Sequence, residues 1–392
     1  MSKRGAQAKR ETRAPRTGGG LSAALAAFAQ NGQLGDLEHD LVIQLANALG
    51  LTPIPDDGKG ASLASLNQLA AASTLCAGAP NLLTIGRPFS GRRVVIVGAG
   101  PSLEHAAPHL ERWARSSIVL AVNTSARRVC KHVRPDLVLI ADPLDHSDQL
   151  AGVTSDVVAL ATMAHPATWE AAASVGRRAF LAIGRPGIDA IRPWIDWRTG
   201  GVCPMAVHLA ALLGADEIVL AGVDLALARD GSAFASGMLP VQRPEMRLAA
   251  TVGWDGEPRQ VREDWQMQHR VLEGFAATHQ GAVRLVNASL GGARIEGWEH
   301  VAPADLDVPA GEIARPAIDL ARGRCLTEEE SFAFASQTVL ACRAAIAARD
   351  AQQRGDEITL AAATAQARGL VGLSVAERAR VAERILAATG LR

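Results

Sequence analysis

Seven short apolar runs between residues 92 and 297 limit how this chain can fold. Each holds four or five mostly apolar residues and lacks the alternation of a half-exposed strand. Such runs are typical of strands covered on both faces, and the helix-like segments between several of them favour a parallel sheet. The sequence therefore predicts an α/β fold with a doubly wound, mostly parallel sheet. The runs are 93–97, 118–122, 137–141, 157–160, 179–183, 217–221 and 283–286.

Helical patterns flank this α/β zone. Apolar residues recur at helical spacing between Leu34 and Ala48, and the capping signals Thr327-Glu-Glu-Glu330 and Ser374-Val-Ala-Glu377 each open a helical pattern. A chain of 392 residues is long enough for two or three domains. We expect a disordered basic leader over 1–20, a helical N-terminal region over 21–90, the α/β catalytic domain over 91–305 and a helical C-terminal region over 306–392.

Composition excludes several classes of protein. The formal net charge is zero, so no overall field attracts nucleic acid or a membrane surface. No apolar run reaches the length of a membrane span, and the first twenty residues lack the apolar stretch of a secretory signal. The five cysteines are scattered without a CxxC pair. We therefore expect a reduced, cytoplasmic protein with no nucleic-acid partner and no membrane span.

A glycine loop, Gly98-Ala99-Gly100-Pro101-Ser102, follows the first run. Ligands of doubly wound sheets bind at the carboxyl ends of strands. Glycines permit close backbone approach, and a helix that begins at Pro101 and Ser102 favours an anion. The pattern departs from GxGxxG, and Asn123 rather than an acidic residue follows the second run, which disfavours NAD. The alternative interpretation is a tight turn without a ligand.

Polar residues also follow other runs. Asn123 can donate and accept hydrogen bonds toward a base or sugar. Asp142 and Asp224 follow the third and sixth runs, where a carboxylate can orient a sugar hydroxyl, act as a base or bind a metal. Local capping is the alternative for Asn123 and Asp142. The two carboxylates would share one cleft if their strands were near neighbours.

Two more segments complete the candidate cleft. Thr199, Gly200 and Gly201 precede a predicted helix. The backbone amides at the start of that helix can bind an anion. After the last run come Asn287, Gly291, Gly292 and Arg294, where the glycines allow close approach and the arginine can meet an anionic group; a conventional turn is the alternative.

Three further residues are weaker candidates for chemistry. Cys203 lacks the pattern of partners that activates a nucleophilic thiol. His208 lies in an apolar helix and suits packing, and His269 is a weak candidate for a general base.

These motifs together resemble the MptE-like/Maf superfamily over about 92–301. One branch holds Maf motility accessory factors, which glycosylate flagellin with nonulosonic acids, and the other holds archaeal 6-hydroxymethyl-7,8-dihydropterin pyrophosphokinases. The glycine loop and Asn123 also look like the CMP-binding elements of bacterial sialyltransferases. The resemblance implies a Rossmann-like, sialyltransferase-like core. It is carried by 98–103, Asn123-Thr124, Pro135-Asp136, Ala141-Asp142-Pro143, 206–214, 219–225 and 287–297.

The resemblance also implies roles for single residues. The nucleotide would be bound by Gly98, Gly100, Pro101, Ser102 and Asn123, and its phosphate or sugar would contact Thr199, Gly200 and Gly201. The catalytic histidine of sialyltransferases has no clear counterpart here, because Val261-Arg-Glu-Asp264 occupies the expected neighbourhood. The base is then Asp142 or Asp224.

Three functions follow from this interpretation. The favoured one is a cofactor-independent glycosyltransferase that moves a nonulosonic sugar from a CMP donor to a Ser or Thr of a protein such as flagellin, because the helical flanks could hold a protein acceptor. The second is a hydroxymethylpterin pyrophosphokinase that uses ATP, with Mg²⁺ held by Asp142 and Asp224. The third is a non-catalytic assembly factor that retains only the fold.

Overall fold

The computed structural model describes residues 78–143, 145–184, 191–196, 199–238, 247–308, 318–327, 330 and 334. The predicted leader, the helical pattern from Leu34 to Ala48 and the capping signal at Ser374 lie outside these residues. The capping signal at Thr327 is confirmed. The Thr327 hydroxyl accepts the N–H of Glu330 at 3.1 Å, and the Glu330 carboxylate accepts the N–H of Thr327 at 3.0 Å.

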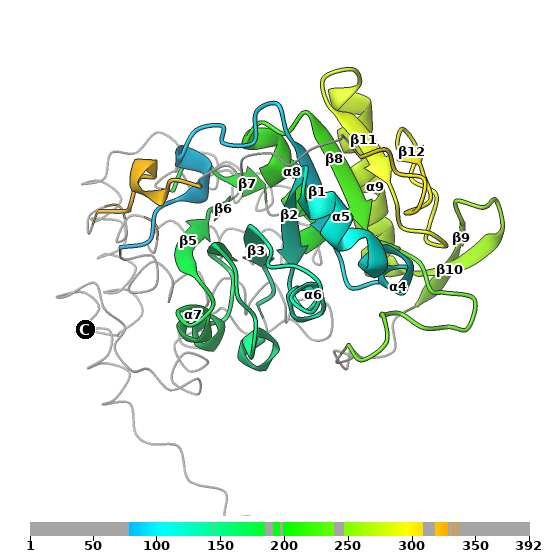
Figure 1. Cartoon of the computed structure of the whole chain (residues 1–392), viewed down its shortest axis with the longest axis horizontal. Helices are drawn as coiled ribbons and strands as arrows, with labels where there is room; N and C mark the ends of the chain where they lie inside the picture. Colours follow the sequence, from blue (N-terminus) through cyan, green and yellow to red (C-terminus); the bar gives the residue numbers. More distant parts are fainter. Residues whose placement is uncertain are drawn as a thin grey trace, which may run out of the picture.

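The core is one eight-stranded sheet in the order β12-β11-β8-β1-β2-β3-β4-β5 (Figure 1). Every pairing within it is parallel. Each of the seven apolar runs corresponds to a strand, so the predicted doubly wound α/β fold is confirmed. The strands are β1 (Arg93–Val97), β2 (Ser117–Val122), β3 (Leu137–Ile140), β4 (Val157–Ala161), β5 (Arg177–Leu181), β8 (Glu217–Ala221), β11 (Arg284–Asn287) and β12 (Glu299–His300).

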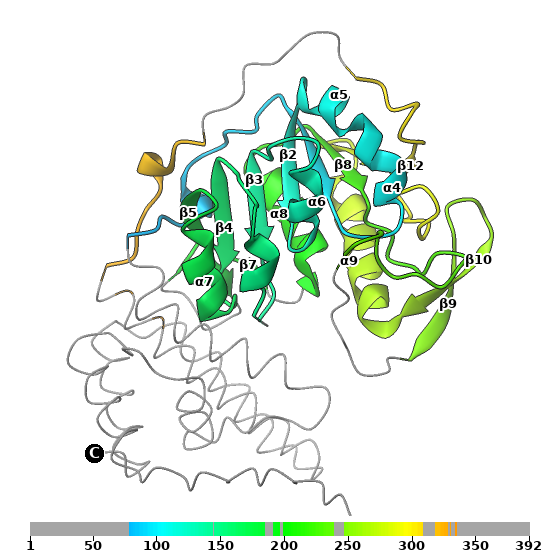
Figure 2. The same cartoon turned by 60° about the horizontal axis from the view of Figure 1, so that its bottom comes forward.

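Helices cover both faces of the sheet (Figures 1 and 2). Residues of α4 (Leu103–Ala106), α5 (Leu110–Ala114), α6 (Ser125–Val129) and α7 (Pro166–Ala172) enter one core cluster. The other cluster receives α8 (Val202–Leu212) and the long α9 (Glu263–His279). Covered faces explain why the strand sequences lack polar alternation.

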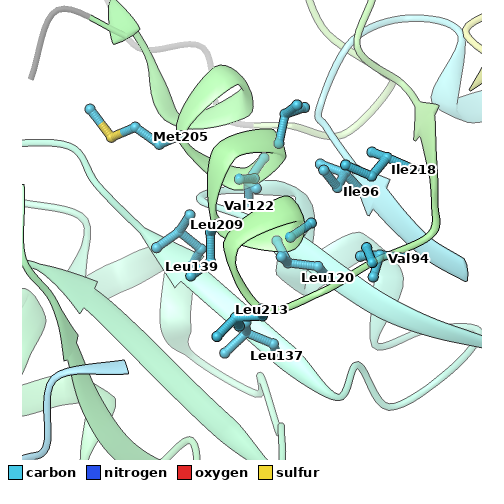
Figure 3. Packing of buried hydrophobic residues seen from close by; sticks show 14 of the residues in the cluster. Val94, Ile96, Leu120, Val122, Leu137, Leu139, Met205, Leu209, Leu213 and Ile218 are labelled. Carbon is cyan, nitrogen blue, oxygen red and sulfur yellow. The ribbon is translucent and has the colours of Figure 1, made fainter. Parts of the chain in front are cut away.

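Successive strand residues serve the two clusters in turn. Val95 and Val97 pack in the first cluster, whereas Val94 and Ile96 pack in the second. Figure 3 shows the second cluster, in which strand side chains meet α8 residues such as Leu209. All five side chains are fully buried, and burying each stabilises the fold by about 1.5–3 kcal/mol.

The order in which strands are added to the sheet reverses beside β1. From β1 the strands are added outward to β5, and the chain then returns to place β8 against the other side of β1. The loops after β1 and β8 therefore leave a topological switch point, which is where open α/β sheets bind ligands. The glycine loop that follows β1 lies at this point.

A hairpin that the sequence analysis did not predict projects beside α9 (Figure 2). It pairs β9 (Leu248–Val252) with β10 (Pro258–Arg262) in antiparallel fashion. Asp255-Gly256 in its loop is a hairpin signal that could have revealed it, and Gly256 has a φ of +85°. The short strands β6 (Ile183–Gly184) and β7 (Ile195–Asp196) also went unpredicted.

Segments from both flanks meet at the β5 edge of the sheet. The N–H of Phe180 donates to Pro80 at 3.0 Å, and the N–H of Asn81 donates to Arg324 at 2.9 Å. The short 3-10 helices η2 (Leu82–Thr84) and η6 (Leu320–Arg322) lie in these two segments. The expected domain limits stay a prediction. None of the described helices is long and apolar enough to cross a membrane.

Candidate functional site

The glycine loop is hydrogen-bonded to the carboxyl end of β8 and to the residue that follows it. The N–H of Gly98 donates to Ala221 at 2.8 Å, and the N–H of Gly100 donates to Gly222 at 2.7 Å. A Cβ at Gly98 would lie 2.5 Å from the Gly222 carbonyl oxygen, and Gly222 itself has a φ of +66°. Contact between two backbones therefore requires these glycines, whether or not a ligand also approaches them.

The carboxylate of Asp224 lies directly beneath the same loop. Its Oδ2 accepts the backbone N–H of Ser102 at 3.1 Å and the Ser102 hydroxyl at 2.9 Å. Asp224 is only 6% exposed, and burial raises the pKa of its carboxyl to about 7 although the Ser102 hydrogen bonds oppose the rise. Asp224 therefore holds the loop in place by hydrogen bonds and is not a base that faces solvent.

The α8 amino end lies close to this carboxylate. Burial, and next the charge of Asp224, raise the pKa of the Cys203 thiol to about 12. A thiol held protonated in this way is a poor nucleophile. The exclusion of Cys203 as a nucleophile therefore has a physical cause.

The shifted carboxyl predicts an unusual dependence of stability on pH. Its pKa is about 7 in the fold, against an ordinary value of 3.8 for an aspartate carboxyl, so between these values the folded protein holds a proton that the unfolded chain releases. This contribution is fully present below pH 3.8 and is lost as pH rises through 7. We expect the free energy of unfolding of the wild type, relative to Asp224→Asn, to fall by up to about 4 kcal/mol across that window. Urea unfolding of both proteins at several pH values measures this, and a constant difference would contradict it.

Asn123 joins the ends of β2 and β3. Its φ of +44° lies in the left-handed region, which asparagine tolerates better than most residues. Its N–H donates to Leu139 at 2.9 Å, and its Oδ1 accepts the N–H of Ala141 at 3.0 Å. Thr124, not Asn123, is the N-cap residue of α6. The Nδ2 group of Asn123 donates to no residue that the structure describes, so both its hydrogens are available to a ligand.

Asp142 follows β3, and its carboxylate meets a histidine. Its Oδ2 lies 3.2 Å from Nε2 of His146, and the two side chains are 12% and 6% exposed. Sequence reasoning assigned no role to His146. The spacing of four residues between Asp142 and His146 was visible, but Asp145 and Asp148 are nearer to His146 in sequence, so only the fold shows which carboxylate is its partner.

Asp142 and Asp224 do not follow neighbouring strands. Because β1 and β2 lie between β3 and β8, three strand spacings, about 14 Å, separate the strand ends. The condition for a shared cleft, that the two strands be near neighbours, is therefore not met, and this strand spacing argues against a single Mg²⁺ held by both carboxylates. Among the described residues, no three His, Cys, Asp or Glu side chains are grouped to hold a metal ion.

The segment Thr199-Gly200-Gly201 leads into α8 and packs against α9. A Cβ at Gly200 would lie 2.9 Å from Cε of Met267, and one at Gly201 would lie 2.5 Å from Nε2 of Gln268. The Thr199 hydroxyl is buried and has no partner within the described part of the chain. The amides of an eleven-residue helix make this end favourable for an anion.

The last loop supports Asp224 from behind. The N–H of Ala293 donates to the carbonyl of Asp224 at 2.7 Å, and a Cβ at Gly292 would lie 2.6 Å from Cα of Asp224. Asn287 is fully buried, and its Oδ1 accepts the N–H of Ser289 at 3.0 Å. Gly292 and Asn287 therefore brace the site rather than line an open cleft.

The remaining candidates in this loop face outward. Gly291 has a φ of +94°, which a turn requires of it. Arg294 is exposed, and its carbonyl lies 2.5 Å from Nε2 of His269. Nδ1 of His269 lies 3.6 Å from Glu273, so this histidine holds the loop and does not face Asp142.

A segment that sequence reasoning missed covers the glycine loop. The N–H of Ala235 donates to the carbonyl of Ala99 at 2.9 Å. Next to it, Phe234 packs edge-on against Trp265, with ring centroids 6.5 Å apart, and Arg262 lies 4.6 Å from the centroid of the same ring. Aromatic and cation–π contacts of this kind hold a surface segment in place.

Comparison with known proteins agrees with this fold. The family described as 6-hydroxymethylpterin diphosphokinase MptE-like matches residues 67–230. The structure resembles a Maf glycosyltransferase from Magnetospirillum magneticum AMB-1, with a TM-score of 0.50 and 16% identity over 80% of this chain and 56% of that chain. The chain thus spans little more than half the length of that protein. A search of curated proteins finds no match.

Two sialyltransferase structures match less closely. One is a Campylobacter jejuni sialyltransferase in complex with cytidine-5′-monophosphate, with a TM-score of 0.33 and 13% identity over 64% of this chain and 99% of that chain. The other holds a trisaccharide acceptor and CMP, with a TM-score of 0.32 and 13% identity over 58% of this chain and 93% of that chain. The predicted resemblance to the MptE-like/Maf superfamily is confirmed: residues 67–230 match the MptE-like family, and the chain is similar in its α/β fold to the Maf glycosyltransferase.

Proposed function

We propose that this protein is a glycosyltransferase that moves a nonulosonic sugar from a CMP donor to a Ser or Thr hydroxyl of a protein, such as flagellin. The observation that carries the proposal is the donor group of Asn123 beside the glycine loop at the switch point. Its Oδ1 is committed to Ala141, which orients the amide so that Nδ2 can donate to the base or sugar of a nucleotide.

In the proposed reaction the departing phosphate meets the amino end of α8. Oriented amides stabilise charge that develops as the bond to the sugar breaks, and such preorganised donors usually supply the largest part of catalysis. The buried Thr199 hydroxyl adds a donor to the same end of the helix. Neither contribution needs a metal ion.

Asp142 is the proposed base. The acceptor hydroxyl gives its proton to the carboxylate, the oxygen forms the new bond to the anomeric carbon, and CMP leaves with the electron pair of the broken bond. Asp142 suits this role better than Asp224, because Asp224 lies beneath Ser102. General-base catalysis contributes about 10²–10⁴-fold.

A hydroxymethylpterin diphosphokinase is the second candidate, because the matching family model carries that description. The reaction would pass diphosphate from ATP to the pterin hydroxyl and would need Mg²⁺. Since one ion cannot reach both Asp142 and Asp224, phosphate oxygens and at most one of these carboxylates would hold it.

Titration calorimetry with CMP and with ATP, each with and without Mg²⁺, distinguishes the candidates. We expect metal-independent binding of CMP. Asn123→Asp keeps the Oδ1 acceptor for Ala141 but removes both Nδ2 donors, so it should weaken CMP binding at least about tenfold, one hydrogen bond being worth about that much. Unfolding of the variant close to the wild-type midpoint shows that the fold survives.

The other possible results of the titration would change the proposal. Binding of ATP only in the presence of Mg²⁺, without binding of CMP, would replace the glycosyltransferase with the diphosphokinase. Binding of neither nucleotide would favour the non-catalytic assembly factor. Equal affinity of the wild type and Asn123→Asp for CMP would remove Asn123 from the nucleotide site.

A further inference from the structure

A buried chain of polar side chains extends from Asp142 into the loop after β3. His146 Nε2 lies 3.2 Å from Asp142 Oδ2, and His146 Nδ1 lies 2.8 Å from Nε2 of Gln149. His146 and Gln149 are 5% and 7% exposed. Buried polar groups destabilise a fold unless they are hydrogen-bonded. Here Gln149 is hydrogen-bonded to His146, and His146 is paired with Asp142.

The partners define which ring nitrogen carries the proton. The amide nitrogen of Gln149 can only donate, so Nδ1 of His146 accepts and Nε2 holds the proton that it donates to Asp142. The backbone N–H of His146 donates to the buried hydroxyl of Thr168 at 3.0 Å, and the N–H of Gln149 donates to the His146 carbonyl at 3.1 Å. The imidazole is thereby fixed in position as well as in tautomer.

We propose that His146 is a positioning residue, held by Gln149 and Thr168, that orients the carboxylate of Asp142 toward the acceptor hydroxyl. The inference rests on the proposed function, in which Asp142 takes the acceptor proton. A carboxylate has about four acceptor sites, so the bond from His146 fixes its orientation and leaves capacity for a substrate hydroxyl. In this arrangement His146 would act through the Asp142 carboxylate and not by its own contact with the substrate.

The tautomer can be tested without the reaction. Long-range ¹⁵N–¹H spectra of the full chain with labelled histidines should show His146 as the Nε2–H tautomer, its signals assigned by their loss in His146→Gln. Gln149→Leu removes the donor to Nδ1 and should abolish the preference for this form. An Nδ1–H form in the wild type, or no response to Gln149→Leu, would overturn the proposal.

The kinetic arm compares two substitutions at one position. His146→Ala should lower kcat about tenfold to a hundredfold, since small misplacement of a reacting group has that effect, with the KM for the CMP donor within about twofold. In His146→Gln the side-chain N–H can still donate to Asp142 and should restore most of kcat. His146→Ala should add nothing in an Asp142→Asn background. The exposed His105→Ala is the matched control.

The spectra and the kinetics together distinguish failure of the His146 proposal from failure of the proposed function. Loss of stability and a raised donor KM in both His146 variants, without rescue by glutamine, would show a merely structural role and overturn the inference. If the wild type transfers no sugar, the proposed function fails, while the tautomer spectra still decide whether the Gln149–His146–Asp142 chain exists.

Discussion

Replacing Gly100 by alanine should destabilise the protein by about 2–5 kcal/mol and abolish nucleotide binding. A Cβ at this position would collide with the Asp224 carboxylate and would lie 2.8 Å from the carbonyl oxygen of Gly222. The carboxylate cannot move away cheaply, because it is buried and accepts two hydrogen bonds from Ser102. The loop must shift instead, which adds overpacking to the loss of buried hydrogen bonds.

Urea unfolding gives the stability change, and CMP titration gives the binding loss. Gly274→Ala is the matched control, because Gly274 lies inside α9 with open space around its Cβ position. That substitution should stabilise the protein by up to about 1 kcal/mol through helix propensity. A Gly100→Ala protein with wild-type stability and affinity would contradict the assignment of the loop as a packed clamp.

Asp142→Asn should lower kcat for sugar transfer by about 10²–10⁴-fold while CMP still binds with nearly wild-type affinity. The amide oxygen can still accept the hydrogen bond from His146, so the side chain keeps its place, but it cannot take a proton from the acceptor. The proposed nucleotide contacts come from the segments after β1 and β2 and from the start of α8, whereas Asp142 follows β3, so binding and turnover should separate.

Single-turnover transfer with radiolabelled donor measures this effect. Asp148→Asn alters an exposed carboxylate in the same loop and should leave the rate unchanged. A kcat within about threefold of the wild type in Asp142→Asn would exclude Asp142 as the base, since a general base contributes far more than that. It would leave the assignment of the nucleotide site untouched.

Local sequence pattern was sufficient to predict the strands of the sheet and the edge at which a ligand would bind. Seven apolar runs gave seven strands because strands covered on both faces need apolar side chains in both directions. The glycine loop at the end of β1 could also be predicted from local sequence, because glycines directly after a strand indicate a sharp backbone turn. The β9–β10 hairpin escaped because β10 is mostly polar and begins with a proline, and because β9 exposes the apolar side chains of Leu248 and Val252 instead of burying them between two layers.

The sequence by itself thus determined which segments form the sheet and which residues end its strands, since both depend on properties of short stretches of chain. Only the tertiary structure decided which strand ends are neighbours. It placed Asp224 under Ser102, separated Asp224 from Asp142 by two strands, and paired Asp142 with His146. These outcomes follow from strand order and burial, which arise from contacts between segments far apart in the chain, and such contacts leave no local periodicity to read.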